Sequence, residues 1–183
     1  DGIGLGDTIE LCKINNLASV GAGESESHAK QTHYVEKKGK KIAVINAAEN
    51  EFLLSKTSTA QAHGFDLIDV YQKIIAAKEA ADFVLLIYHG GVENFQWPYP
   101  KMRKNLKFLT TAGVDAIVCH HSHCYSGYEI SNGVPIFYGL GNFFFNRNAK
   151  ISSWFEGIIL KLIIDQNSKL NFEIIPYEQS LNN

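Results

Sequence analysis

The chain has 183 residues, of which 45% are hydrophobic and 20% are charged, enough for one hydrophobic core of ordinary size. Its formal net charge of −2 at pH 7 argues against nucleic acid or an anionic membrane surface as a partner, since both attract strongly basic proteins. No signal peptide and no membrane-spanning run is present, and three cysteines form neither an even set nor a C-x-x-C pair. We therefore expect a cytoplasmic protein from a reducing compartment.

The N-terminal region predicts a short helix, a short strand and a β-hairpin. A glycine-rich loop opens the chain, and Thr8–Asn15 then predicts a helix that Asp7 or Thr8 could cap. Leu17–Val20 predicts a short strand. The hairpin strands are expected at 32–36 and 41–46, joined by a basic turn in which Gly39 suits a positive φ.

The middle of the chain alternates between helical and strand patterns. Apolar residues keep helical spacing over Asp66–Ala80, and the apolar run Phe83–Tyr88 predicts a buried strand. Pro100 then opens a second helix, Gly113 ends it, and Val114–Cys119 predicts the next strand. Helix, strand, helix, strand indicates parallel pairing in one α/β sheet.

The C-terminal third changes to short strands, which predicts a β-rich and antiparallel region. We find no linker, repeat or low-complexity tract, so residues 1–183 are expected to form a single domain. The expected strands are Tyr128–Ile130, Ile136–Tyr138, Gly157–Ile164 and Leu170–Pro176.

Two of the apolar strands end in histidine, which is the main clue to function. His89 follows the first, and His121 and His123 follow the second. Two residues of extended chain rise about 6.5 Å, so the side chains of His121 and His123 share a face while His120 points away. Neighbouring strand ends meet at one edge of a parallel sheet, which predicts a metal site there. Core histidines hydrogen-bonded to backbone carbonyls are the alternative.

Three further residues are candidates for the same site. Glu93 could orient an imidazole, reach a metal or donate a proton, or it could be a solvated loop carboxylate. Arg103 could bind an anionic substrate, although a basic residue in a first helical turn usually faces water. Asn142, the other candidate substrate-binding residue, follows a glycine-rich segment that either approaches a ligand closely or forms a bulge; composition favours the bulge.

The remaining histidines and cysteines carry weaker signals. His28, His33 and His63 lie in polar segments and are expected at the surface. Cys119 and Cys124 flank the histidines and could be soft metal ligands, although Cys119 fits buried strand packing better. The chain has no complete dinucleotide-binding loop, no P-loop and no nucleophile elbow.

Ordered motifs along nearly the whole chain resemble the CapA family of capsule-synthesis and poly-γ-glutamate-biosynthesis proteins. This resemblance implies a fold similar to the calcineurin-like metallophosphoesterases, a four-layer α-β-β-α sandwich with a centre of two divalent metal ions such as Mn, Zn or Fe. It implies that His89, His121 and His123 are metal ligands, with Glu93 and Asn142 close by. The motifs are residues 20–23, 39–43, 49–52, 88–93, 98–100, 112–123 and 135–143.

The chain departs from this family at its front. Family members carry Gly-Asp, Asn/Glu and Asn-Asn-His segments before the region that matches Asp1, and none is present here. The resemblance therefore implies a CapA-like domain without its N-terminal portion and a metal centre without its bridging carboxylate. We expect weak or single metal occupancy of this chain by itself.

Two functions remain open for the parent protein. The first is metal-dependent hydrolysis of a phosphoester or related anionic substrate, with Glu93 or His89 handling the proton. The second is non-catalytic binding or export of an anionic capsule polymer, because a fold does not fix a function. Parent proteins of this family are often envelope-associated, and the sequence leaves the oligomeric state open.

Overall fold

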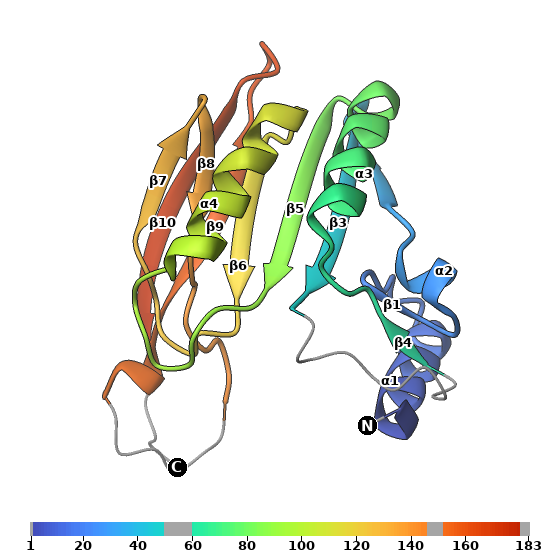
Figure 1. Ribbon diagram of the computed structural model, residues 1–183, viewed down its shortest axis with the longest axis horizontal. Helices are drawn as coiled ribbons and strands as arrows, with labels where there is room; N and C mark the ends of the chain where they lie inside the picture. Colours follow the sequence, from blue (N-terminus) through green and yellow to red (C-terminus); the bar gives the residue numbers. More distant parts are fainter. Residues whose placement is uncertain (1, 50–59, 146–151, 180–183) are drawn as a thin grey trace.

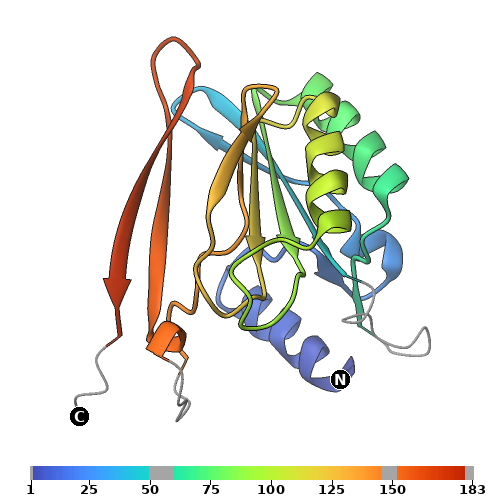
Figure 2. The same cartoon turned by 60° about the vertical axis from the view of Figure 1, so that its left-hand side comes forward.

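A six-stranded mixed sheet organises the protein, in a computed structural model that describes residues 2–49, 60–145 and 152–179 (Figure 1). Its strand order is β2-β3-β5-β6-β8-β7. Helices α3 and α4 cover one face of this sheet, and the two-stranded ribbon of β9 and β10 lies on the other side (Figure 2). The described residues thus form three layers: helices, sheet and ribbon. Most of the motif at 49–52 lies outside the described residues.

The N-terminal segments differ from the sequence predictions. Helix α1 spans Gly2–Ile14, so the glycine-rich stretch before Thr8 is helical rather than a loop. Ile9 is the buried residue of this helix and packs it against the rest of the chain, which compensates for the low helix propensity of glycine. The strand predicted at Leu17–Val20 is wrong, because this segment has no regular structure.

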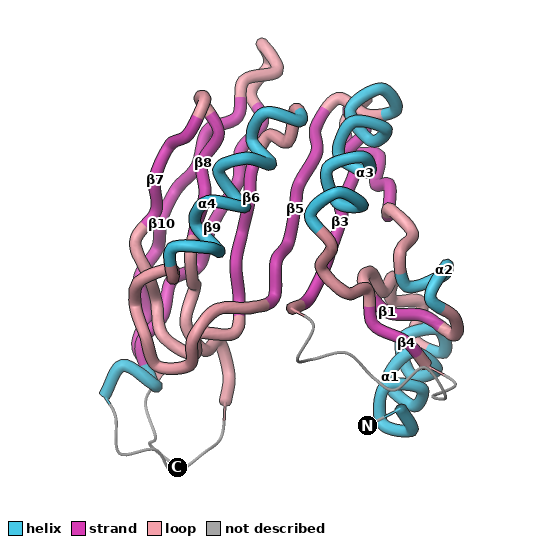
Figure 3. Tube along the Cα trace, in the orientation of Figure 1, coloured by secondary structure: helices cyan, strands magenta, loops and turns pink. Residues whose placement is uncertain are grey.

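Three short elements lie near helix α1. Strand β1 (Ala22–Gly23) pairs antiparallel with β4 (Gln61–Ala62), and helix α2 (Glu26–Ala29) follows β1. Figure 3 shows them grouped with α1 at one side of the carboxyl edge of the main sheet.

The predicted hairpin is confirmed. Strand β2 (His33–Lys37) pairs antiparallel with β3 (Lys40–Ala48). Lys38 and Gly39 occupy the turn with φ of 50° and 73°, the left-handed conformation that a tight hairpin requires at both central positions.

The helix–strand alternation in the middle of the chain is also confirmed. Helix α3 (Leu67–Ala80) leads into β5 (Phe83–His89), and α4 (Pro100–Leu109) leads into β6 (Ala116–His120). Strands β3, β5 and β6 pair in parallel. Asp66 caps α3 by accepting hydrogen bonds from two backbone N–H groups of the first turn.

A 3₁₀ turn, η2 (Thr110–Ala112), continues from α4, and Gly113 ends it with φ of 99°. The main core lies between these helices and the sheet and consists of buried side chains. Its largest members include Ile74 and Leu106 of the helices and Leu86, Ile117 and Ile136 of the sheet.

The C-terminal third is β-rich as predicted, but it is not wholly antiparallel. Strand β7 (Tyr128–Ser131) pairs antiparallel with β8 (Val134–Phe137), whereas β8 pairs parallel with β6. The connection through residues 121–127 passes over one strand position, so β7 lies at the edge of the sheet and runs opposite to β6. The β7–β8 hairpin then places β8 between them, parallel to β6.

After a 3₁₀ turn, η3 (Ser152–Phe155), strands β9 (Glu156–Ile164) and β10 (Leu170–Glu178) form the antiparallel ribbon. Phe172 joins the ribbon to the sheet, with its ring centroid 5.0 Å from that of Phe137 and 5.2 Å from that of Tyr128. The α/β class is therefore confirmed, with a mixed sheet. In the described parts of the chain, no helix is long and apolar enough to cross a membrane.

Candidate metal centre

Three adjacent parallel strands end at the same edge of the sheet. The backbone N–H of Glu49, just after β3, donates to the carbonyl of His89 at 2.9 Å. The N–H of Gly90, just after β5, donates in turn to the carbonyl of His120 at 3.0 Å. The segments that leave the three strands therefore stay side by side, which brings residues from distant parts of the sequence to one edge.

His121 and His123 lie beyond the end of β6, and their backbone is not extended as predicted. Their φ angles are 104° and 55°, in the left-handed region. The carbonyl of Ser122 between them accepts a hydrogen bond from the N–H of Asn94 at 2.8 Å. The chain turns sharply because pairing with β5 stops at His120, yet both imidazoles still reach the site, with ring centroids 5.7 Å apart.

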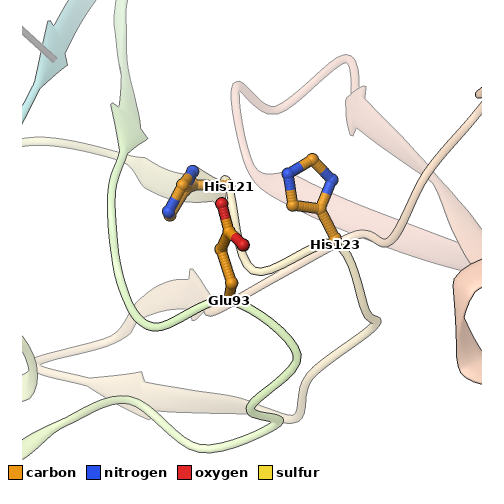
Figure 4. A group of neighbouring side chains, drawn as sticks. All are labelled: Glu93, His121 and His123. Atoms are coloured by element: carbon orange, nitrogen blue, oxygen red, sulfur yellow. The ribbon is translucent and has the colours of Figure 1, made fainter. Parts of the chain in front are cut away.

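Glu93 joins these two histidines in a group that could hold a metal ion (Figure 4). The ligand atoms of Glu93, His121 and His123 all lie within 4.8 Å of one another. Donors bound about 2.0–2.2 Å from one ion lie roughly 3–4 Å apart, so a small side-chain adjustment closes the set. Two imidazoles and one carboxylate are ligands that suit Zn, Mn or Fe.

His89 lies beside this group without being one of its three members. Its ring centroid is 5.1 Å from that of His121. Partial burial and the neighbouring imidazoles of His121, His120 and His123 lower the pKa of His89. The neutral imidazole favoured in this way is the form that binds a metal or accepts a proton.

Asn142 fixes the ring of His123. Its Oδ1 lies 2.8 Å from Nδ1 of His123, and its Nδ2 donates to the backbone carbonyls of His123 at 3.3 Å and Trp154 at 3.0 Å. Because the amide nitrogen faces two acceptors, the amide oxygen must face His123, and Nδ1 of His123 carries the proton. The lone pair of His123 is thus on Nε2, which is free to bind a cation.

Aromatic side chains and the end of β10 support this pair. Trp154 stacks on His123 with ring centroids 4.9 Å apart and an interplanar angle of 19°, and Phe145 meets the same ring edge-on at 5.5 Å. The hydroxyl of Tyr177 and the amide of Gln179 donate to the backbone carbonyl of Asn142 at 2.5 and 2.7 Å. The C-terminal ribbon therefore helps to position a candidate ligand of the site.

His120 does not point away from the other histidines as predicted. It pairs in register with His89 on the neighbouring parallel strand, so the two side chains emerge on the same face. His120 lines one cavity of about 560 Å³ together with His89, His121 and His123, and the other walls are mainly apolar residues of 140–145 and β9. Burial lowers the pKa of His120, which keeps it neutral.

Arg103 lies in a different environment from the histidines. Its guanidinium donates to both carboxylate oxygens of Glu129, at 2.8 and 2.7 Å. Arg103, a hydrogen bond from Tyr138 and the charge of Lys107 lower the pKa of Glu129 to about 2. Arg103, Glu129 and Tyr138 line a separate cavity of about 350 Å³ with Trp97 and Tyr128. A role of Arg103 in substrate binding therefore stays a prediction.

The surface prediction for His63 is wrong. Its side chain is 2% exposed, with Nδ1 2.7 Å from the carbonyl of Asn46 and Nε2 3.0 Å from Asp69. It joins the end of β3 to α3, a contact between segments that its polar sequence neighbours do not reveal. His28 and His33, expected at the surface, are half-buried.

The cysteine thiols beside the histidines do not complete the metal group. Cys119 is buried in the core as expected, and Cys124 is buried in the turn that follows. Burial raises the pKa of both thiols, which disfavours the thiolate that binds metals. Neither belongs to the group of potential ligands found among the described residues.

Sequence reasoning did not single out Glu49 as a site residue. Its carboxylate accepts hydrogen bonds from the hydroxyls of Tyr88 (2.7 Å) and Tyr99 and from the N–H of Gly91 (3.0 Å). Burial opposes ionisation of Glu49, but these hydrogen bonds outweigh it and lower the pKa of the carboxyl. The available signal was its place directly after a strand parallel to the one that ends in His89.

The fold and site define an α/β protein with a mixed sheet and a group of imidazole and carboxylate side chains at the carboxyl edge of its parallel strands. Residues 2–147 match the sequence profile of the family described as "Bacterial capsule synthesis protein PGA_cap". The chain belongs to this family.

Two curated relatives agree with this assignment. The chain is 30% identical over 178 residues to the PGA biosynthesis protein CapA of Bacillus subtilis (strain 168), covering 96% of this chain and 46% of the relative. It is 30% identical over 151 residues to the capsule biosynthesis protein CapA of Bacillus anthracis, covering 79% of this chain and 36% of that relative. The chain thus spans less than half the length of either.

A solved structure shares the fold. A hypothetical protein from Thermus thermophilus superposes with a TM-score of 0.55 at 11% sequence identity, covering 81% of this chain and 62% of that one. At this identity the likeness concerns the fold alone.

Proposed function

We propose that this chain contributes the histidine-rich side of a metal-dependent hydrolase site that acts on a phosphoester or related anionic substrate in capsule or poly-γ-glutamate synthesis. The observation that carries this proposal is the group of Glu93, His121 and His123, with Nε2 of His123 directed away from Asn142. Oriented imidazoles beside a carboxylate are typical of catalytic metal sites.

A divalent ion bound there would supply Lewis-acid activation of the substrate and of water. His121, His123 and Glu93 would hold it, and Asn142 would keep His123 in the required tautomer. This geometry favours a ligand role for Glu93 over a proton-donor role. His89, neutral and beside His121, is placed to accept a proton or to ligate a second ion.

We further propose that the whole protein completes this site with another layer. The face of the sheet opposite α3 and α4 carries Ile42, Val44, Leu85 and Ile87, which are only half-buried. A sheet normally packs both apolar faces, and the curated relatives are more than twice as long as the region matched. Further strands beside the β9–β10 ribbon, which already lies on this side, would complete a second sheet. With helices outside it, that sheet would give the four-layer sandwich, and the added segments would bring the remaining metal ligands.

One observation favours the alternative of a binding or export factor for an anionic polymer. A cavity of about 740 Å³ between the β2–β3 hairpin and the end of β9 is lined by four lysines, one aspartate (Asp165) and apolar residues of β3 and β9. The lysines are Lys37, Lys38, Lys40 and Lys161. The first three come from the hairpin turn and lie at the end of β3 away from the histidines. Such a basic groove could hold a polyanion without any chemistry at the metal group.

The test compares full-length protein with its His121→Ala variant and with a His33→Ala control on β2. Turnover of a phosphodiester and of poly-γ-glutamate is measured with added Mn²⁺. The hydrolase proposal expects turnover that His121→Ala abolishes and His33→Ala leaves intact. Metal-independent polymer binding without turnover of either substrate would overturn it in favour of the alternative.

A further inference from the structure

The loop between β5 and α4, residues 90–99, carries Glu93 and is attached at both ends to one side chain outside it. We infer that Glu49 is a positioning residue for Glu93: its carboxylate clamps the two ends of this loop and so fixes the carboxylate that completes the metal group. This inference rests on the proposed function, because it concerns the geometry of the same site.

The two ends of the loop meet at Glu49. Oε2 of Glu49 accepts the N–H of Gly91, two residues before Glu93. Oε1 accepts the hydroxyl of Tyr99, the residue that precedes α4. Because the two oxygens belong to one planar group, the start and the end of the loop are held in a fixed relation.

The clamp itself is held rigidly. Tyr88 is 2% exposed, packs edge-on against Phe65 with ring centroids 5.0 Å apart, and donates its hydroxyl to Oε1 of Glu49. Gly90 leaves the space that the carboxylate uses, since a Cβ atom at this position would lie 2.4 Å from Cγ of Glu49. The side chain of Glu49 is therefore fixed from several sides.

A second attachment ties the same loop to the histidines. The N–H of Asn94, next to Glu93, donates to the carbonyl of Ser122, which lies between His121 and His123. Glu93 is thus bracketed: Glu49 holds the chain before it and the histidine turn holds the chain after it. The start of the loop is also held by the N–H of Gly90, which donates to the carbonyl of His120. Loss of the contacts to Glu49 would therefore loosen the segment between Gly90 and Asn94, which carries Glu93.

The experiment measures binding of Mn²⁺ by titration calorimetry and the visible absorption of bound Co²⁺ in full-length protein. Ligand-orienting partners commonly contribute 10-fold to 100-fold in metal affinity, so Glu49→Gln should weaken Mn²⁺ binding about tenfold. Glutamine replaces one carboxylate oxygen, an acceptor, with an NH₂ donor at a group to which three hydrogen-bond donors now point. Tyr99→Phe removes one of the donors to Glu49 and should weaken Mn²⁺ binding about threefold, the size of effect expected when a single hydrogen bond is lost.

Tyr138→Phe is the matched control, because Tyr138 donates to Glu129 at 2.7 Å in a tyrosine–carboxylate pair that includes neither Glu49 nor a residue of the 90–99 loop. It should leave Mn²⁺ affinity and the Co²⁺ spectrum unchanged. Glu49→Gln should shift the Co²⁺ spectrum in the same sense as Glu93→Gln, a signature that general loss of stability would not produce.

The outcomes separate this inference from the proposed function. If neither Glu93→Gln nor His121→Ala weakens Mn²⁺ binding, the metal site itself is wrong. If both weaken it while Glu49→Gln and Tyr99→Phe bind as the wild type does, the metal site stands and the positioning role of Glu49 is overturned. Should Glu49→Gln fail to fold in a melting control, Tyr99→Phe decides by the same criterion.

Discussion

Oδ1 of Asn142 lies 2.8 Å from Nδ1 of His123, and this contact sets the direction of the free lone pair on the histidine ring. The two residues come from different segments of the chain. His123 lies in the turn after β6, and Asn142 lies in the segment after β8. Their contact orients the imidazole of His123 as a candidate metal ligand.

The first prediction concerns this orientation. Asn142→Ala removes the acceptor at Nδ1 and should weaken Mn²⁺ or Zn²⁺ binding about 10-fold to 100-fold, the usual effect of losing such a partner. Asn142→Asp keeps an acceptor and should retain more of the affinity. Equilibrium dialysis with metal analysis measures both. Wild-type affinity in Asn142→Ala would show that His123 does not depend on this contact.

Metal stoichiometry gives the second prediction. The group found among the described residues has three members and lacks the carboxylate that bridges two ions in a dinuclear site. The chain of residues 1–183 alone should therefore bind no more than one divalent ion, weakly enough to be lost on gel filtration. Elemental analysis of the eluted protein checks this, and two ions retained per chain would contradict it.

The third prediction is a pH dependence of stability. Glu129 has a pKa of about 2 in the folded protein, below the ordinary value of 4.5. A carboxyl with a depressed folded pKa stabilises the fold above its unfolded pKa, and this contribution is lost as the pH falls from 4.5 toward 2. Glu129→Gln should lower stability at pH 7 by about 1 kcal/mol, since the pair with Arg103 is partly exposed.

Urea unfolding at pH 7, 4.5, 3.5 and 2.5 would measure this effect. The difference between wild type and Glu129→Gln should shrink steadily toward the lowest pH. A difference that is constant across the series would mean that the charge of Glu129 contributes nothing to the stability of the fold.

His63 provides the fourth prediction. Both ring nitrogens are engaged, with the carbonyl of Asn46 and with Asp69, and the ring is buried. His63→Ala should lower the free energy of unfolding by about 2–3 kcal/mol, because it leaves a cavity and an unsatisfied carbonyl. Metal affinity should not change. His28→Ala, at a half-buried position of α2, is the control and should cost much less.

The sequence alone determined the elements whose cause is local. Apolar spacing located α3 and α4, and the apolar runs located β5 and β6. Pro100 marked a helix start through its fixed φ. His89, His121 and His123 were predicted as candidate ligands because residues that end parallel strands meet at one edge, whatever the detail of the turns.

Tertiary structure decided the contacts between distant segments. The local sequence around a side chain does not indicate which distant residue will contact it. The partners of Glu49, His63 and Arg103 could therefore not be predicted. In the structure they are Tyr99, Asp69 and Glu129, respectively. The left-handed backbone of His121 and His123 likewise arises from where pairing with β5 stops. Periodicity reports burial and backbone geometry within an element, whereas the site depends on the path of the chain between elements.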